Sequence, residues 1–338
     1  MTLQERFSGC LIGGLLGDAI GAPVEAETSA YIRKTFRSVD DILALEKVEE
    51  LLGAYWTVGR YTDDTQMTVC VAEWLLQDGP EDGRKLLARF AEAFRPARRY
   101  GSSTAGILQA FEEHQDEWRA LATLMFPAGS YGNGSAMRVG PIGCLYYQDP
   151  PALFKACQIS SLTTHSHPLA VQGATLQASA VAALIRCDHN LEVDRYLQSL
   201  DLVLKRLARE GPEPVEYRQA LETISNGLDA GHEPARMAET LGTGLEAKEA
   251  VPMAIYCFLH ARDSFEQVIQ QAVFLGGDTD TIASMAGSLS GAYLGEKAIP
   301  GRWCARMVDE DITPGTLAGL ARQLAQSKRV PFHGATTQ

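Results

Sequence analysis

The chain has 338 residues, of which 46% are hydrophobic and 21% charged, and its formal net charge is −12. This composition supports a sizeable hydrophobic core and excludes wholesale disorder. The negative charge disfavours nucleic acid and anionic lipid as partners, so we expect neither nucleic-acid binding nor membrane association. An anionic ligand would bind only where cations or helix N-termini reverse the local field.

The cysteines and the N-terminus bear on the compartment. Seven scattered cysteines form no Cys-x-x-Cys pair, which is typical of reduced thiols in a cytoplasmic protein. Residues 1–22 have the apolar centre of a secretory signal, but Glu5 spoils the basic leader and Asp18 interrupts the apolar run. That run is also too short to span a bilayer. We therefore expect a cytoplasmic protein.

Helical periodicity dominates the chain from its start. Gly9, Gly13, Gly17 and Gly21 recur every four residues, a spacing that lets a second helix approach closely. Asp18 lies in the same run and needs polar partners if it is buried. Amphipathic patterns predict further helices after residue 64 and over 84–94, 103–111, 151–162, 170–185 and 215–228.

The later part of the chain predicts inner helices. The segment 251–259 is apolar nearly all round, with Pro252 expected in the first turn of a buried helix, and 281–294 repeats small side chains. Short extended pieces are expected only near 138–147, and no series of alternating strands follows. Turn residues cluster at 78–83, 187–191, 211–214 and 231–234 without forming an interdomain linker. We predict an all-α single domain over residues 1–330 and a polar C-terminal tail over 331–338.

Two short polar segments, Tyr61–Thr65 and Gly276–Thr281, carry the strongest chemical signal. Each brings two carboxylates and hydroxyl groups together where a helix is expected to begin. Such carboxylates repel one another unless a cation neutralises them. Helix capping is the alternative interpretation, but one cap needs one oxygen acceptor and explains two such clusters poorly. Oxygen ligands alone favour magnesium, manganese or calcium over zinc, and paired divalent ions would support metal-assisted hydrolysis.

Other candidate site residues carry weaker signals. The glycine-rich loop Gly129–Arg138 could cradle phosphate or be a simple flexible turn, and its Arg138 could bind phosphate or be a structural ion-pair partner. His165 and His167, two residues apart, do not share a helix face, so a common metal is not expected. The His165 side chain could form a hydrogen bond with a substrate, or it could be a structural histidine whose hydrogen bonds lie within the fold. A loop carboxylate such as Glu25 is ordinarily a solvated surface group.

Taken together, these residues resemble the ADP-ribosylglycohydrolase family, the relatives of dinitrogenase-reductase-activating glycohydrolase. The resemblance extends to about residue 295, with matching segments at Gly13–Asp18 continuing to Glu25, Tyr61–Thr65, Gly129–Arg138, Thr164–His165 and Gly276–Gly287. Within the family, Gly129–Gly134 and Val251–Leu259 are more similar to the branch that hydrolyses ADP-ribosylserine than to the arginine-directed branch.

The resemblance implies an all-α, orthogonally packed fold with a binuclear metal cleft. Its two divalent cations, magnesium in preference to manganese, would be held by Thr62, Asp63, Asp64, Asp278, Asp280 and Thr281. Glu25 matches a mobile catalytic glutamate. The positions that hold the diphosphate, ribose and adenosine are matched by Gly129, Ser130, Tyr131, Gly132, Asn133 and His165. Leu245 would flank the adenine, and Met125 and Phe126 both lie near the position of an aromatic that helps to sandwich it.

The expected function is hydrolysis of the glycosidic bond between ADP-ribose and a protein side chain. Serine-type O-linkage is favoured, with poly(ADP-ribose) and O-acetyl-ADP-ribose as further substrates. The expected partners are ADP-ribose and ADP-ribosylated proteins, and the expected state is a monomer. The alternatives are an arginine-linked ADP-ribose hydrolase, a binuclear phosphohydrolase and a non-catalytic ADP-ribose binder.

Overall fold

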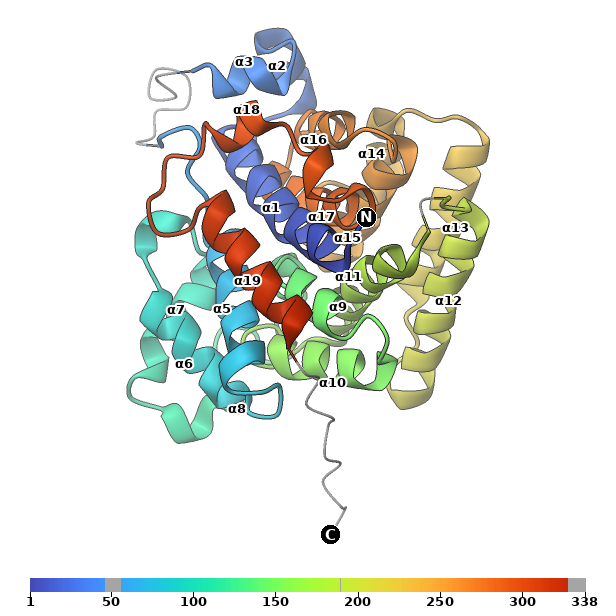
Figure 1. The fold of residues 1–338 in the computed structure, drawn as a ribbon. Coiled ribbons are helices and arrows are strands. Elements are labelled where there is room, and N and C mark those ends of the chain that lie inside the picture. The colour runs from blue at the N-terminus through green and yellow to red at the C-terminus, as the bar shows by residue number, and fades with distance from the viewer. Residues whose placement is uncertain (46–55, 189, 328–338) are drawn as a thin grey trace.

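A computed structural model describes residues 1–45, 56–188 and 190–327, and these form helices joined by short loops (Figure 1). The first half contains α1 (Leu3–Gly21), α2 (Ser29–Thr35), α3 (Val39–Leu43), α5 (Asp63–Gln77), α6 (Gly83–Ala93), α7 (Ser102–Phe111), α8 (Trp118–Leu121), α9 (Gly140–Leu145) and α10 (Pro150–Ser161). The second half contains α11 (Pro168–Arg186), α12 (Val193–Glu210), α13 (Val215–Asp229), α14 (Pro234–Leu241), α15 (Ala247–His260), α16 (Phe265–Val273), α17 (Thr279–Leu294), α18 (Gly301–Cys304) and α19 (Pro314–Gln326). Short 3₁₀ turns lie at Ala22–Val24 (η1), Pro96–Arg98 (η2), Gln115–Glu117 (η3), Asn133–Ser135 (η4) and Glu296–Ala298 (η5).

The all-α prediction is confirmed. Within the described ranges the only extended pairing is two isolated β-bridges, Thr28 with Gly276 and Gly132 with Glu246. Both bridges join loops that border the site described below.

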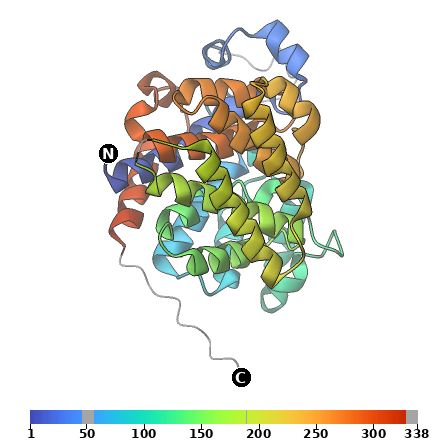
Figure 2. The same cartoon turned by 90° about the vertical axis from the view of Figure 1, so that its right-hand side faces the viewer.

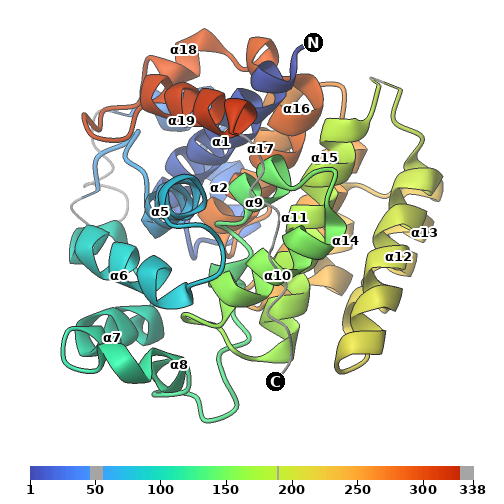
Figure 3. The ribbon, with the colours of Figure 1, turned by 60° about the horizontal axis from the view of Figure 1, so that its bottom comes forward.

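Among the described helices, α1 and α17 make the most extensive contact, and they lie side by side at the centre of the molecule (Figures 1 and 3). A Cβ atom placed on Gly13 would lie 2.2 Å from the carbonyl oxygen of Gly287, and one on Gly17 would lie 2.0 Å from that of Ala283. Because the partner number falls as the α1 number rises, the two helices run antiparallel. The glycine stripe thus does what its spacing predicts: it brings two backbones into contact.

The remaining helices enclose this pair. The apolar helix α15 is buried from Ala250 to Leu259 and packs against α17 and α11. Helices α12 and α13 form one outer side, whereas α6, α7 and α8 lie at the opposite side (Figures 1 and 2). The buried apolar side chains of these elements form one continuous core.

The predicted helices over 84–94, 103–111, 151–162, 170–185, 215–228 and 281–294 are confirmed within a few residues as α6, α7, α10, α11, α13 and α17. Two local predictions are wrong. The segment expected to be extended near 138–147 contains helix α9, whose start is favoured by Pro141 in its first turn. Pro252 lies in the interior of α15, because that helix already begins at Ala247.

Helices α1 and α11 are long and apolar enough to cross a membrane by length and composition alone, yet all of the α1 window and 78% of the α11 window are buried inside the protein. Packing in the core therefore accounts for their apolar character.

All seven cysteines are free thiols, five of them buried. The predicted polar tail at 331–338 lies outside the described residues, and the division into a domain over 1–330 and a tail stays a prediction.

Candidate metal centre and substrate cleft

The two acidic segments begin the helices α5 and α17. Thr62 is the N-cap of α5 and Asp278 is the N-cap of α17. Asp63 and Asp64 lie in the first turn of α5, and Asp280 lies in the first turn of α17. The free N–H groups and the positive dipole end of each helix stabilise carboxylates at these positions. The Thr62 hydroxyl accepts a capping hydrogen bond from Asp64 N, whereas the Asp278 side chain makes no capping hydrogen bond. Capping therefore accounts for only some of the oxygen atoms.

The fold brings the two segments together although 217 residues separate the atoms in contact. The hydroxyl oxygen of Thr281 lies 3.3 Å from Oδ2 of Asp64. Carboxylate oxygens of Glu25, Asp278 and Asp280 lie within 4.8 Å of one another. We call Glu25, Asp63, Asp64, Asp278 and Asp280 the acidic end of the cleft.

Burial makes this cluster electrostatically costly. Asp64 is 2% exposed and Asp280 is 4% exposed. Burial first, and neighbouring carboxylates second, raise the pKa values of Asp63, Asp64 and Asp280 well above the usual range. Burial raises the pKa of Asp278 to about 6, although hydrogen bonds with Asp280 and Asn133 oppose the shift.

These residues fit a hard divalent cation. Oδ1 of Asp64 is buried and has no hydrogen-bond partner, which is costly unless a cation occupies the space beside it. Every side chain gathered here offers oxygen, the donor that magnesium and manganese prefer. The donor set and the orphaned oxygen together support a divalent-cation site at the acidic end, and the binding of two ions there stays a prediction.

Asp18, on α1, holds the start of α5 in place through hydrogen bonds. It is fully buried, and both oxygens accept hydrogen bonds from the start of α5: from Thr62 N at 2.9 Å and its Oγ1 at 2.8 Å, and from Thr65 N at 3.0 Å and its Oγ1 at 2.6 Å. Burial raises the pKa of Asp18 to about 6. These bonds supply the polar partners that the sequence required. They also fix Thr62, whose hydroxyl lies 3.5 Å from Oδ2 of Asp64.

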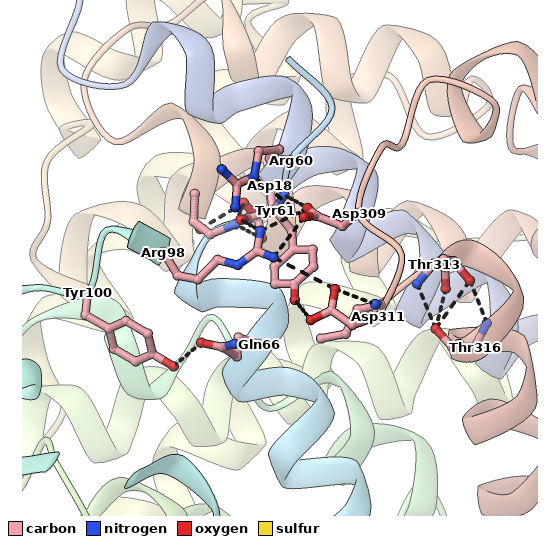
Figure 4. Close-up of polar contacts among 12 residues, drawn as sticks. Asp18, Arg60, Tyr61, Gln66, Arg98, Tyr100, Asp309, Asp311, Thr313 and Thr316 are labelled. Atoms are coloured by element: carbon pink, nitrogen blue, oxygen red, sulfur yellow. Dashed lines mark hydrogen bonds and ion pairs between the residues drawn. The ribbon is translucent and has the colours of Figure 1, made fainter. Parts of the chain in front are cut away.

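The chain just before α5 is held by a second network (Figure 4). Arg98 donates to the carbonyl of Tyr61 at 2.8 Å and to both oxygens of Asp309 at 2.8 and 2.9 Å, and its guanidinium lies 3.5 Å from the centre of the Tyr61 ring. The Tyr61 hydroxyl donates to Asp311 at 2.7 Å. A loop near the C-terminus therefore anchors the segment that carries Thr62 to Asp64, a role that no local sequence signal indicates.

Glu25 lies at the end of the 3₁₀ turn η1 that follows α1. The backbone N–H of Ala26 donates to the carbonyl of Gly277 at 2.8 Å, so this turn is joined to the segment just before Asp278. The Glu25 carboxylate pairs with Arg99 at 3.0 Å and lines the cleft. The ordinary interpretation of Glu25 as a solvated surface group is therefore wrong.

The acidic end opens into a cleft of about 360 Å³. Of the residues predicted for the site, all but Thr62 and Gly129 line it. Thr62 is buried behind Asp64. Gly129 has a φ of +83°, and a Cβ atom there would lie 2.4 Å from the hydroxyl of Ser166, so it shapes the turn at the back of the loop.

The backbone of the glycine-rich loop is hydrogen-bonded to the segment at the start of α15. The N–H of Asn133 donates to the carbonyl of Leu245 at 2.9 Å, and the N–H of Ala247 donates to that of Tyr131 at 3.1 Å. The Asn133 side chain donates to Asp278, which links the loop to the acidic end. The loop is therefore braced, in contrast with the flexible turn considered from sequence.

His165 lies under this loop. Burial first, and the positive charge of Arg138 second, lower the pKa of His165 to about 3, so its ring is neutral near pH 7. Nδ1 lies 2.7 Å from the Thr164 hydroxyl. A Cβ atom on Gly134 would lie 2.6 Å from the ring, so glycine is needed there. Arg138 is fully buried, does not line the cleft and donates to Ser160 and Thr163. Among the described residues no carboxylate pairs with it, so it is a structural hydrogen-bond donor and neither a phosphate ligand nor an ion-pair partner there.

The far side of the cleft, which we call the loop end, consists of Phe126, Tyr131 and Leu245. These side chains are 46%, 46% and 66% exposed. Phe126 lines the cleft, whereas Met125 is not among its lining residues. Phe126 is therefore the better candidate for the aromatic position that the sequence left open.

Several lining residues were missed from sequence. They are Arg99, Gly101, Ser102, Ser103, Thr104, Met137 and Glu246. The run of glycine and hydroxyl residues at 101–104, which begins α7, is the one local signal that could have pointed to them.

Comparison with known proteins agrees with this geometry. The family model described as ADP-ribosylglycohydrolase matches residues 1–333. Two relatives are named ADP-ribosylhydrolase ARH3: the protein from Bos taurus is 34% identical over 88% of this chain and 87% of its own length, and that from Homo sapiens is 34% identical over 93% of each. A solved structure described as an ADP-ribosylglycohydrolase-related protein complex covers 96% of this chain and 98% of its own, with 26% identity and a TM-score of 0.65. The resemblance found in the sequence is confirmed, and the chain belongs to the ADP-ribosylglycohydrolase family.

Proposed function

We propose that this hydrolase of ADP-ribosylated substrates is a metal-dependent ADP-ribosyl-acceptor hydrolase that releases ADP-ribose from serine side chains. The observation that carries the proposal is the meeting of the two acidic segments with Glu25 at one end of a cleft whose other end exposes aromatic surface. This combination suits a metal-assisted glycosidase that acts on a long, nucleotide-bearing substrate.

The metal ions would be held at the acidic end. The proposed ligands are Thr62, Asp63, Asp64, Asp278, Asp280 and Thr281, and the proposed ions are two Mg²⁺, with Mn²⁺ as the alternative. When bound, such ions supply positive charge that offsets the carboxylates and polarises substrate oxygens and water.

The chain's own residues would bind and orient the ADP-ribose. The braced loop from Ser130 to Asn133 presents backbone groups to the diphosphate and ribose, and the neutral His165 offers a hydrogen bond without adding charge. Tyr131, Leu245 and Phe126 present flat or apolar surface to the adenine.

Glu25 is the side chain placed to move a proton. Hydrolysis breaks the bond between the anomeric carbon and the serine oxygen, forms a bond from that carbon to a water oxygen, and transfers one proton from the water to the leaving oxygen. Glu25 lines the cleft beside Asp278 and Asp280 and is partly exposed, so substrate and water can reach it.

Serine linkage is favoured by the segments Gly129–Gly134 and Val251–Leu259, which resemble the serine-directed branch, and by relatives named ADP-ribosylhydrolase ARH3. Arginine-linked ADP-ribose would occupy the same cleft and differ only beyond the anomeric carbon, so it is the principal alternative.

A hydrolysis panel tests the proposal. Serine-linked, arginine-linked and polymeric ADP-ribose are each incubated with Mg²⁺, Mn²⁺ or EDTA, and the products are separated by chromatography. We expect intact ADP-ribose from the serine-linked peptide with Mg²⁺ and none with EDTA. Release of AMP or phosphate would indicate a phosphohydrolase instead, and tight ADP-ribose binding without any turnover would indicate a binder.

A further inference from the structure

Arg99 makes contacts that no sequence pattern predicts. Its Nη1 lies 3.0 Å from Oε2 of Glu25 and 2.7 Å from the carbonyl oxygen of Ala22, at the two sides of the turn that carries Glu25. Its guanidinium also lies 4.2 Å from the centre of the Trp56 ring. Three different groups thus fix the position of this cation.

The backbone at Arg99 is unusual as well. Its φ is +62°, in the left-handed region that non-glycine residues seldom occupy. This turn sends the side chains of two adjacent arginines to different parts of the site. Arg98 contacts Tyr61, just before α5, and Asp309 in the loop before α19, whereas Arg99 contacts the turn after α1.

Charge explains why Glu25 needs such a partner. A carboxylate oxygen of Glu25 lies within 4.8 Å of those of Asp278 and Asp280, and like charges at this distance repel. Among the described residues that line the cleft, Arg99 is the one lysine or arginine. The ion pair is partly buried, with side chains 26% and 30% exposed, so solvent screens it less than a surface pair.

We infer that Arg99 is a positioning residue for Glu25: it holds the carboxylate beside the acidic end and thereby sets the turnover rate and not the affinity for ADP-ribose. The inference rests on the proposed function, because it assigns Glu25 to proton transfer. A competing role for Arg99, direct contact with a substrate phosphate, would affect binding instead.

The variant Arg99→Gly removes the guanidinium and suits the positive φ, so the turn is retained. We expect kcat on a serine-linked ADP-ribosyl peptide to fall by about ten- to a hundredfold, with KM and the Kd for ADP-ribose nearly unchanged. Methylguanidinium added to the buffer should restore part of the lost kcat.

The matched control is Arg302→Ala. Arg302 also pairs with carboxylates, Asp40 and Glu266, and also lies over a tryptophan ring, but it does not line the cleft. Its kcat should equal that of the parent protein. In the Glu25→Gln background, Arg99→Gly should cause no further loss and methylguanidinium should have no effect.

Three results in solution would overturn the inference: an unchanged kcat in Arg99→Gly, an equal further loss in the Glu25→Gln background, or a rise in KM and Kd without a fall in kcat. Crystal structures of the parent protein and of Arg99→Gly test the position of Glu25 without any measurement of turnover. We expect the Glu25 carboxylate to leave its place beside Asp278 and Asp280 in the variant, and an unmoved carboxylate contradicts the inference. If the parent protein released no ADP-ribose from any substrate, the proposed function would fail, while a displaced Glu25 would still support the positioning role.

Discussion

The two ends of the cleft differ in composition and burial. At the acidic end, Asp64 and Asp280 are buried at helix N-termini, and α1 and the Asp18 hydrogen bonds hold those helices in place. At the loop end, Tyr131 and Leu245 are exposed on a loop that is braced through its backbone. Chemistry that depends on charge needs fixed, desolvated oxygens, whereas binding of a flat base needs accessible surface. The comparison predicts that changes at the acidic end affect turnover and stability and that changes at the loop end affect affinity.

The largest effect is expected for Asp64→Asn. The orphaned oxygen of Asp64 would lose its negative charge, so turnover should fall on the order of 10³-fold and divalent-ion binding measured by calorimetry should be lost. Asp194→Asn is the matched control, because Asp194 also lies in a helix first turn but is exposed on α12. Unchanged metal affinity in Asp64→Asn would show that the acidic end is not the metal site.

A large loss of stability is expected for Gly17→Ala. The new methyl group would lie 2.0 Å from the carbonyl oxygen of Ala283, so α1 and α17 would have to separate, at a cost of about 3 kcal/mol in the free energy of unfolding. Urea denaturation measures the change. Gly319→Ala in α19, where nothing lies within 4 Å, should be stabilising by about 0.5–1 kcal/mol. Equal tolerance of both substitutions would mean that the close approach of α1 to α17 does not stabilise the fold.

The metal-free protein should lose stability as pH rises. Burial raises the pKa values of Asp18 and Asp278 to about 6, so the folded state binds more protons than the unfolded state above about pH 4. This contribution is fully present at low pH and is lost as pH passes through 6, by about 2–3 kcal/mol per group. Thermal unfolding in EDTA should therefore show a lower Tm at pH 8 than at pH 5.5, and excess Mg²⁺ should reduce the difference. A Tm in EDTA that rose over this interval would contradict the buried-carboxylate account.

The smallest effect is expected at the loop end. Phe126→Ala should weaken ADP-ribose binding by roughly three- to tenfold, because an aromatic face contributes about 0.5–1.5 kcal/mol. Met125→Ala is the control, since Met125 is similarly exposed but does not line the cleft. Calorimetric titration gives both constants, and Tm should stay unchanged in each variant. A larger loss in Met125→Ala would reverse the assignment of the adenine contact.

Much of the site was predictable because its signals are local. Asp63, Asp64, Asp278 and Asp280 stand out as crowded carboxylates at helix starts, and the cleft contains all four. The sequence did not reveal the role of Arg138, because a charged residue in a glycine-rich loop resembles a ligand contact. The fold instead buries Arg138 against Phe90 and neighbouring oxygen atoms. Pro252 misled because helix propensity does not fix where a helix begins.

The sequence by itself determined the helical class, the glycine stripe on α1 and the two acidic segments, because periodicity, caps and charge crowding are each encoded within a few residues. Only the tertiary structure decided that Asp18 caps the start of α5, that Asp309 anchors it through Arg98, and that Arg99 holds Glu25. Each of these contacts joins residues that are distant in sequence. Which helix faces meet depends on the packing of the whole core, and no local pattern specifies it.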